Sequence, residues 1–156
     1  MAGLSVRRVV AENGFYIDTC SGVSMRPMLR AGTDTFVVEA LRGAARPMDV
    51  VLYELPSGKN LLHRVIETRE DEYIILGDNC ITLEHVPGDW VLGRLTAFYR
   101  GERRVELTDI RYRLYVRLWC RPWRMRVLAL RVRGGVMRRL RALRRRLLPG
   151  KAGQTP

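Results

Sequence analysis

Residues 15–107 alternate short runs rich in β-branched and aromatic residues with turn residues, and this alternation constrains the fold most. Such runs, bounded by Gly, Pro, Asn and Asp, indicate strands. Because no helical pattern lies between them, they predict a compact antiparallel or mixed β domain. The segments LPSGKN (55–60) and YRGERR (99–104) predict hairpin turns. The predicted strands are Phe15–Thr19, Thr35–Glu39, Asp49–Glu54, Asn60–Thr68, Glu72–Leu76, Val91–Arg100 and Arg103–Leu107.

Helical patterns flank this β region on both sides. Residues 4–13 have apolar positions at helical spacing and end at Gly14, a typical C-terminal cap. From Thr108 the pattern is helical again, and Pro122 and the pair Gly134–Gly135 predict interruptions. We therefore expect an α+β protein that is mainly β. The predicted divisions are a β domain over residues 1–107, a basic amphipathic helical extension over 108–150 and a disordered tail over 151–156.

The positive charge is concentrated in the C-terminal third of the chain. The formal net charge is +12, yet residues 109–156 hold 15 Lys and Arg against one acid, so residues 1–108 carry a net −2. Apolar residues interleave with the arginines, which favours a helix lying on anionic lipid. That helix would bury Trp119, Trp123, Leu128 and Leu130. The alternative is a helical appendage with a solvated arginine face, and nucleic acid is the least favoured partner.

Several classes of protein are disfavoured by the sequence. No stretch approaches the roughly 18–20 uninterrupted apolar residues that a membrane span needs. The N-terminus has neither the apolar core nor the cleavage site of a signal peptide. The three cysteines are widely spaced and form no Cys-x-x-Cys pair, which predicts free thiols and no zinc site. We expect a location in the cytoplasm or peripheral to the cytoplasmic membrane, and no metal or cofactor.

Ser24 and His63 are the candidates for nucleophile and base. A serine hydroxyl is a poor nucleophile unless a neighbouring base takes its proton. Of the two histidines, His63 lies in a predicted strand and His85 in a predicted loop, so His63 is better fixed. Taken alone, Ser24 has an ordinary interpretation as a turn residue or helix cap, and His63 as a partly buried sheet residue. The run GVSMR also lacks the second glycine of a nucleophile elbow, because Arg26 stands there.

The order of four segments along the chain strengthens the case for Ser24 and His63. The segments are GVSMRPML, RPMDVVLYE, LLHRVIE and LGDNCITLE. Together they resemble the signal peptidase I family, with the LexA-type repressors as more distant kin. The family has a Ser-Met-x-Pro-x-Leu run at its nucleophile, a Gly-Asp-Val-Val strand, a base before Arg-Val-Ile and a Gly-Asp-Asn box. The matches here are Ser24–Leu29, Met48–Val51, His63–Ile66 and Gly77–Asn79. The resemblance covers residues 14–95 and implies a coiled, mostly β domain with the serine on a turn that leaves a strand.

The resemblance also implies roles for these residues. Ser24 would attack a peptide carbonyl, and His63 would take its proton, as in the family members whose base is histidine. Two acids are candidates for orienting His63: Asp78 in the Gly-Asp-Asn box, and Glu84, where the Ser-His type usually has aspartate. The backbone N–H of Ser24 would contribute to the oxyanion hole. Some relatives add a hydroxyl two residues before the nucleophile, where this chain has Gly22.

The expected function is therefore a serine endopeptidase that cleaves a precursor, signal or leader peptide. Residues 1–23 contain no stretch that we expect to span a membrane, so the resemblance does not by itself indicate secretory signal peptides as substrates. One alternative is a degenerate family member that binds peptide or membrane without turnover. A LexA-like regulator is a further alternative, disfavoured because no helix-turn-helix precedes the β domain.

Overall fold

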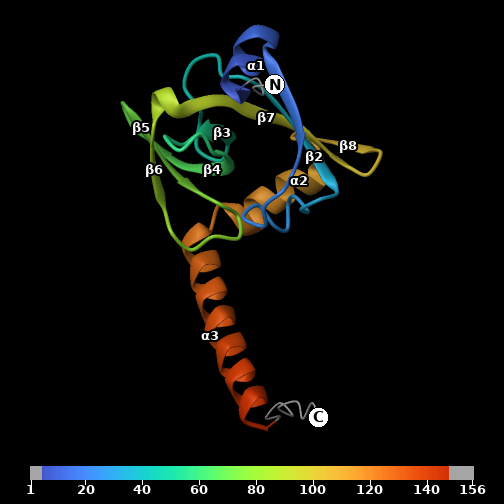
Figure 1. Cartoon of the computed structure of the whole chain (residues 1–156), viewed down its shortest axis with the longest axis vertical. Helices are drawn as coiled ribbons and strands as arrows, with labels where there is room; N and C mark the ends of the chain where they lie inside the picture. Colours follow the sequence, from blue (N-terminus) through green and yellow to red (C-terminus); the bar gives the residue numbers. More distant parts are fainter. Residues whose placement is uncertain (1–4, 148–156) are drawn as a thin grey trace, which may run out of the picture.

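The computed structural model describes residues 5–147 of the chain, with side chains described through residue 141. The tail predicted over residues 151–156 therefore lies outside the described residues. The protein is a mixed α+β structure built mostly on one antiparallel sheet, and a long C-terminal helix projects from it (Figure 1). The predicted α+β class, mainly β, is confirmed.

The sheet is organised around its longest strand. Its eight strands are β1 (Phe15–Thr19), β2 (Asp34–Ala40), β3 (Val50–Glu54), β4 (Asn60–Thr68), β5 (Glu72–Leu76), β6 (Glu84–Pro87), β7 (Val91–Arg100) and β8 (Arg103–Glu106). Their order is β1-β2-β7-β3-β4-β5-β6, with β8 paired to β7. The ten residues of β7 let it pair with β2 along one side and with β3 and then β8 along the other.

Strand β3 is buried on both faces, which places it between two hydrophobic cores. Val50 and Leu52 belong to one core cluster, and Val51 and Tyr53 belong to the other. This division follows from the two-residue period of a strand, which points successive side chains to opposite faces. The turn after β1 contributes four further residues to the first cluster: Cys20, Met25, Met28 and Leu29.

Helix α1 (Val6–Asn13) precedes the sheet and is capped at both ends. The Ser5 side chain accepts a hydrogen bond from the N–H of Arg8. Gly14 follows the helix with φ of 78° and donates its N–H to the carbonyl of Val10. A glycine adopts this left-handed conformation without a Cβ penalty. The predicted stop at Gly14 is confirmed.

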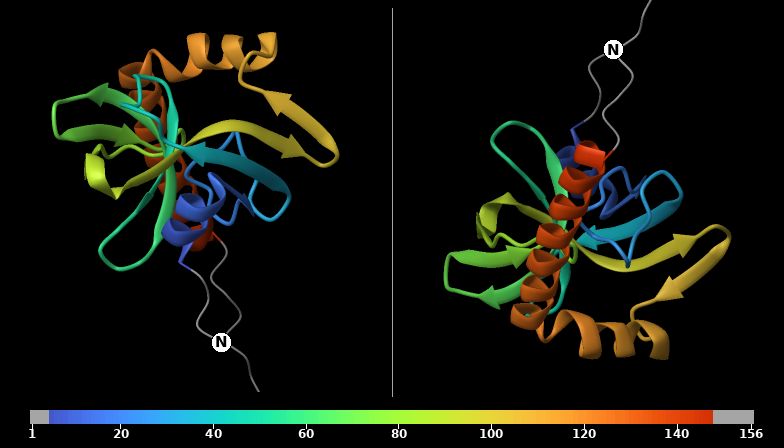
Figure 2. Two further views of the ribbon diagram at one scale, coloured as in Figure 1. Left: turned by 90° about the horizontal axis from the view of Figure 1, so that it is seen from above. Right: turned by 90° about the horizontal axis from the view of Figure 1, so that it is seen from below.

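The C-terminal segment forms a short helix, a π-helical turn and a long helix. These are α2 (Ile110–Tyr115), η2 (Val116–Cys120) and α3 (Trp123–Leu147). Figure 2 shows α1 and α2 well apart in space, with α2 directly after β8. Val10 of α1 and Tyr112 of α2 nevertheless belong to the same core cluster. Among the described residues, no helix is long and apolar enough to cross a membrane.

Helix α3 begins just after Pro122 and continues through Gly134–Gly135, so the predicted interruption at the two glycines is wrong. Each glycine disfavours an exposed helix by only about 1 kcal/mol relative to alanine. The neighbouring Arg, Leu, Met and Ala residues are good helix formers and offset that cost.

Strand β6 differs from the sequence-based expectation, which has a loop at residues 84–87. It is a four-residue strand paired with β5 at the edge of the sheet. Glutamate and proline have low strand propensity, so this segment carries little strand signal of its own. Its pairing with β5 moves two residues of interest, Glu84 and His85, from a predicted loop onto the sheet.

Gly93 of β7 lies where the backbones of β2 and β3 approach from either side. A Cβ added there would overlap the backbone oxygen of Glu39 and lie 2.5 Å from a methyl group of Val38. We therefore expect Gly93→Ala to lower the free energy of unfolding by about 1–3 kcal/mol, measured by urea denaturation. Gly134→Ala is the control, because that glycine lies in α3 with open space around it. Equal stability of the two variants would contradict the close approach.

Candidate active site

Ser24 lies on the turn between β1 and β2, and apolar residues fix that turn to the core. Met25 is 2% exposed, while Ser24 is half-buried. The turn is closed by Leu29, whose N–H donates to the carbonyl of Met25 at 3.0 Å. Its two ends meet where the N–H of Gly32 donates to the carbonyl of Cys20 at 2.7 Å. The methionines of this run are therefore core residues that hold the serine at the surface of the turn.

The Gly77–Asn79 segment is hydrogen-bonded to the turn that carries Ser24. The N–H of Asn79 donates to the carbonyl of Ser24 at 2.7 Å, and its side-chain amide donates to the carbonyl of Val23 at 3.2 Å. A Cβ added to Gly77 would lie 2.9 Å from the Ser24 carbonyl oxygen and 3.2 Å from Cδ2 of His63. Gly77 thus lies between the backbone of Ser24 and the ring of His63, where only a glycine fits.

His63, on β4, is buried and hydrogen-bonded through one ring nitrogen. Its Nδ1 lies 3.0 Å from Oε1 of Glu84 and 2.9 Å from the hydroxyl oxygen of Tyr53. The Tyr53 hydroxyl donates its single proton to Oε2 of Glu84 at 2.6 Å. The proton between His63 and these two groups must therefore be on Nδ1. In the neutral ring this leaves a lone pair on Nε2, the atom that a general base uses.

The protonation states of the two groups around His63 follow from their surroundings. The hydrogen bond from His63 lowers the pKa of Glu84 against the opposing effect of burial, and the bond from Tyr53 lowers it further. Burial raises the pKa of Tyr53, and its hydrogen bond to Glu84 and the nearby negative charge raise it further. At neutral pH the site therefore contains an ionised Glu84 and a protonated Tyr53.

Ser24 and His63 line one cavity of about 650 Å³. Among the described residues, Nε2 of His63 has no hydrogen-bond partner, so the hydroxyl of Ser24 does not bond to it in this structure. Catalytic hydrogen bonds are often long or absent without substrate and form in the substrate complex. Asn60 lines the same cavity, and its Oδ1 is also buried without a hydrogen-bond partner among the described residues. Apolar side chains form much of the wall, among them Val6, Met25, Phe36, Leu52 and Leu62.

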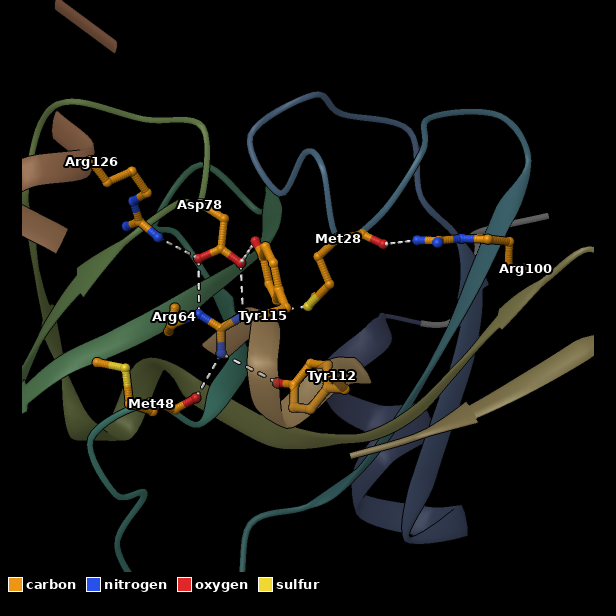
Figure 3. Close-up of polar contacts among 8 residues, drawn as sticks. All are labelled: Met28, Met48, Arg64, Asp78, Arg100, Tyr112, Tyr115 and Arg126. Atoms are coloured by element: carbon orange, nitrogen blue, oxygen red, sulfur yellow. Dashed lines mark hydrogen bonds and ion pairs between the residues drawn. The ribbon is translucent and has the colours of Figure 1, made fainter. Parts of the chain in front are cut away.

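Asp78 does not contact His63, which corrects its assignment as an orienting acid. Both of its oxygens bind Arg64, at 2.7 and 2.8 Å. Arg126 of α3 donates to it at 3.0 Å, and the Tyr115 hydroxyl donates at 2.8 Å (Figure 3). Burial by itself would raise the pKa of Asp78, but the charge and hydrogen bonds of Arg64, with help from Arg126, hold that pKa below its usual range. Asp78 is the centre of a buried ion network.

The two arginines around Asp78 and the hydroxyl of Tyr53 are absent from the sequence-based set of site residues. Arg64 directly follows His63, and its charge within an apolar strand is a signal of a buried partner. Tyr53 and Arg126 offer no such signal, because a strand tyrosine and an arginine in an arginine-rich helix are ordinary residues. The other histidine, His85, is exposed and lies 3.2 Å from Glu72 at the surface.

A scan against protein-family models found no matching family, and a search of curated proteins found no significant match. Among the residues that the structure describes, no group of three or more His, Cys, Asp or Glu side chains is placed to hold a metal ion. The three cysteines are all free thiols.

Replacing Asp78 should destabilise the fold strongly. In Asp78→Asn, Arg64 and Arg126 would remain buried without a counter-charge, which costs about 3–5 kcal/mol in the free energy of unfolding. The matched control is Glu67→Gln, which removes an exposed ion pair to Arg69 and should cost less than about 1 kcal/mol. Both are measured by urea denaturation at pH 7.

The loss of stability caused by Asp78→Asn should depend on pH in a defined direction. Because the folded-state pKa of Asp78 is depressed, its contribution to stability is present above the ordinary carboxyl pKa and is lost as pH falls through the folded value. The difference in the free energy of unfolding between wild type and Asp78→Asn should therefore be largest at pH 7 and should shrink below about pH 4. A difference that stays constant down to acid unfolding would contradict the role of the ionised carboxylate.

Proposed function

We propose that the protein is a serine endopeptidase of the signal-peptidase-like type, with Ser24 as nucleophile, His63 as base and Glu84 as the acid that orients His63. The observation that carries this proposal is the hydrogen bonding of His63. Glu84 and Tyr53 hold its Nδ1, Nε2 has no hydrogen-bond partner among the described residues, and His63 lines the same cavity as Ser24.

The proposed reaction follows from these positions. As Ser24 Oγ attacks the carbonyl carbon of a peptide bond, Nε2 of His63 takes the hydroxyl proton. The positive imidazolium is stabilised by the ionised Glu84 at Nδ1, and Tyr53 keeps that carboxylate in place. His63 then gives the proton to the leaving amine, and a water molecule hydrolyses the acyl-enzyme by the same route. The backbone N–H of Ser24 is proposed as an oxyanion donor.

A peptide is the substrate class that this cavity suits. Its wall includes apolar side chains that can receive an apolar residue of an extended chain. The buried Oδ1 of Asn60 offers an acceptor for a peptide N–H, a group that every peptide substrate carries. The resemblance of residues 14–95 to the signal peptidase I family gives the same substrate class, a precursor, signal or leader peptide.

The proposal is tested with an internally quenched peptide library and three variants. Ser24→Ala and His63→Ala should each lower cleavage by about a thousandfold or more, because nucleophile and base act as a unit. Glu84→Gln should retain binding and lose about a hundredfold or more in kcat, since the neutral amide stabilises the imidazolium poorly. Unchanged thermal unfolding of Ser24→Ala controls for the fold. Cleavage that survives in Ser24→Ala would refute the assignment.

A wild-type protein that binds library peptides but cleaves none of them would instead support the alternative of a degenerate, peptide-binding member. Unaltered Ser24 in the mass spectrum after incubation with a serine-reactive phosphonate would give the same answer. Labelling of Ser24 that depends on His63 would support catalysis.

Gly77→Ala tests whether the spacing of Ser24 and His63 matters. The added methyl group would lie 2.7 Å from Sγ of Cys80 and 2.9 Å from the carbonyl oxygen of Ser24, so the groups around it must move apart. A displacement of about 1 Å costs roughly a hundredfold in rate, which is the expected loss in kcat/KM. Gly88→Ala is the control, because its added Cβ meets only ordinary contacts at 3.6 Å or more. Equal activity of the two variants would show that this spacing does not limit catalysis.

A further inference from the structure

Helix α3 exposes a continuous apolar stripe to solvent. Its members recur every three or four residues, the spacing that puts them on one face of a helix. Each is at least 49% exposed, and Figure 1 shows α3 projecting beyond the sheet along most of its length. The stripe consists of Met125, Leu128, Val132, Val136 and Leu140. A helix of this kind in water lacks the partner that would bury its apolar face.

The charge around this stripe has a single sign. Residues 110–147 contain 14 arginines and no Asp or Glu. Arg126 is buried against Asp78, while the other described arginines of this segment are exposed. A partner for the stripe must therefore accept apolar side chains and a dense positive charge together.

We infer that α3 docks on the surface of an anionic lipid bilayer, with its apolar stripe among the acyl chains and its arginines among the headgroups. A bilayer of this composition meets both requirements at once. A second copy of the helix would bring arginines together without any acid to neutralise them. Nucleic acid would neutralise the arginines but leave the stripe exposed. This inference does not depend on the proposed peptidase activity.

The structure changes which residues contact the lipid. Trp119, Trp123 and Leu130, which the sequence predicts at the interface, are only partly exposed. Leu128 is exposed and belongs to the stripe. The base of α3 is fixed to the β domain by the buried contact between Arg126 and Asp78 at 3.0 Å. Docking of the helix would therefore also hold the β domain at the membrane.

The test uses full-length protein and vesicle flotation, with two matched triple variants. Leu128→Gln/Val132→Gln/Leu140→Gln removes apolar surface and keeps the charge, and it should weaken partitioning by about tenfold or more. Arg131→Gln/Arg138→Gln/Arg141→Gln keeps the stripe and should weaken partitioning by about fivefold per arginine at low salt. Because all six side chains are exposed, the β domain should unfold at the same urea concentration in both variants.

The probes are vesicles of phosphatidylcholine with phosphatidylglycerol, vesicles of phosphatidylcholine alone, and a DNA duplex. The inference predicts flotation with the anionic vesicles, weakened by salt and by both triple variants, and little flotation with phosphatidylcholine alone. Absence of flotation by the wild type, or unchanged flotation of the apolar-stripe variant, would overturn it. Tighter binding to the DNA duplex than to anionic vesicles, equal in wild type and the apolar-stripe variant, would assign the surface to nucleic acid.

Discussion

The buried carboxylate of Asp78 joins parts of the chain that are far apart in sequence. It binds Arg64 from β4, Arg126 from α3 and the hydroxyl of Tyr115 from α2. Two buried guanidinium groups tolerate each other only because this carboxylate lies between them. The neighbouring residue Gly77 contacts the Ser24 turn, so the ion network also fixes the loop on which the candidate active site rests.

On strand β4, the candidate catalytic base His63 and the structural residue Arg64 are neighbours in sequence. His63 and Arg64 are adjacent, and strand geometry points adjacent side chains to opposite faces. His63 meets Glu84 and Tyr53 beside the cavity, and Arg64 meets Asp78 in the interior. The two acids predicted to share one task therefore have different tasks. One contacts the candidate base, and the other neutralises buried arginines.

Most strands were predictable from the sequence, because turn residues flank each run of β-branched and aromatic residues. The strands at residues 15–19, 60–68, 72–76 and 91–100 have the predicted bounds. Two elements were not predictable, for physical reasons. The strand at 84–87 forms because β5 supplies its hydrogen bonds, not because Glu84 and Pro87 favour strands. Helix α3 continues through Gly134–Gly135 because its neighbours favour the helix enough to offset two glycines.

The sequence by itself identified the candidates: a turn serine, a strand histidine, two acids that could orient it and a cationic helical segment. These follow from local patterns and from the order of short motifs. Only the tertiary structure decided which acid reaches His63, because β6 must pair with β5 before Glu84 can do so. It also decided that Arg126, unlike the other described arginines of its helix, is buried and pairs with Asp78. A buried charge requires an opposite charge, and local sequence does not specify where that partner lies.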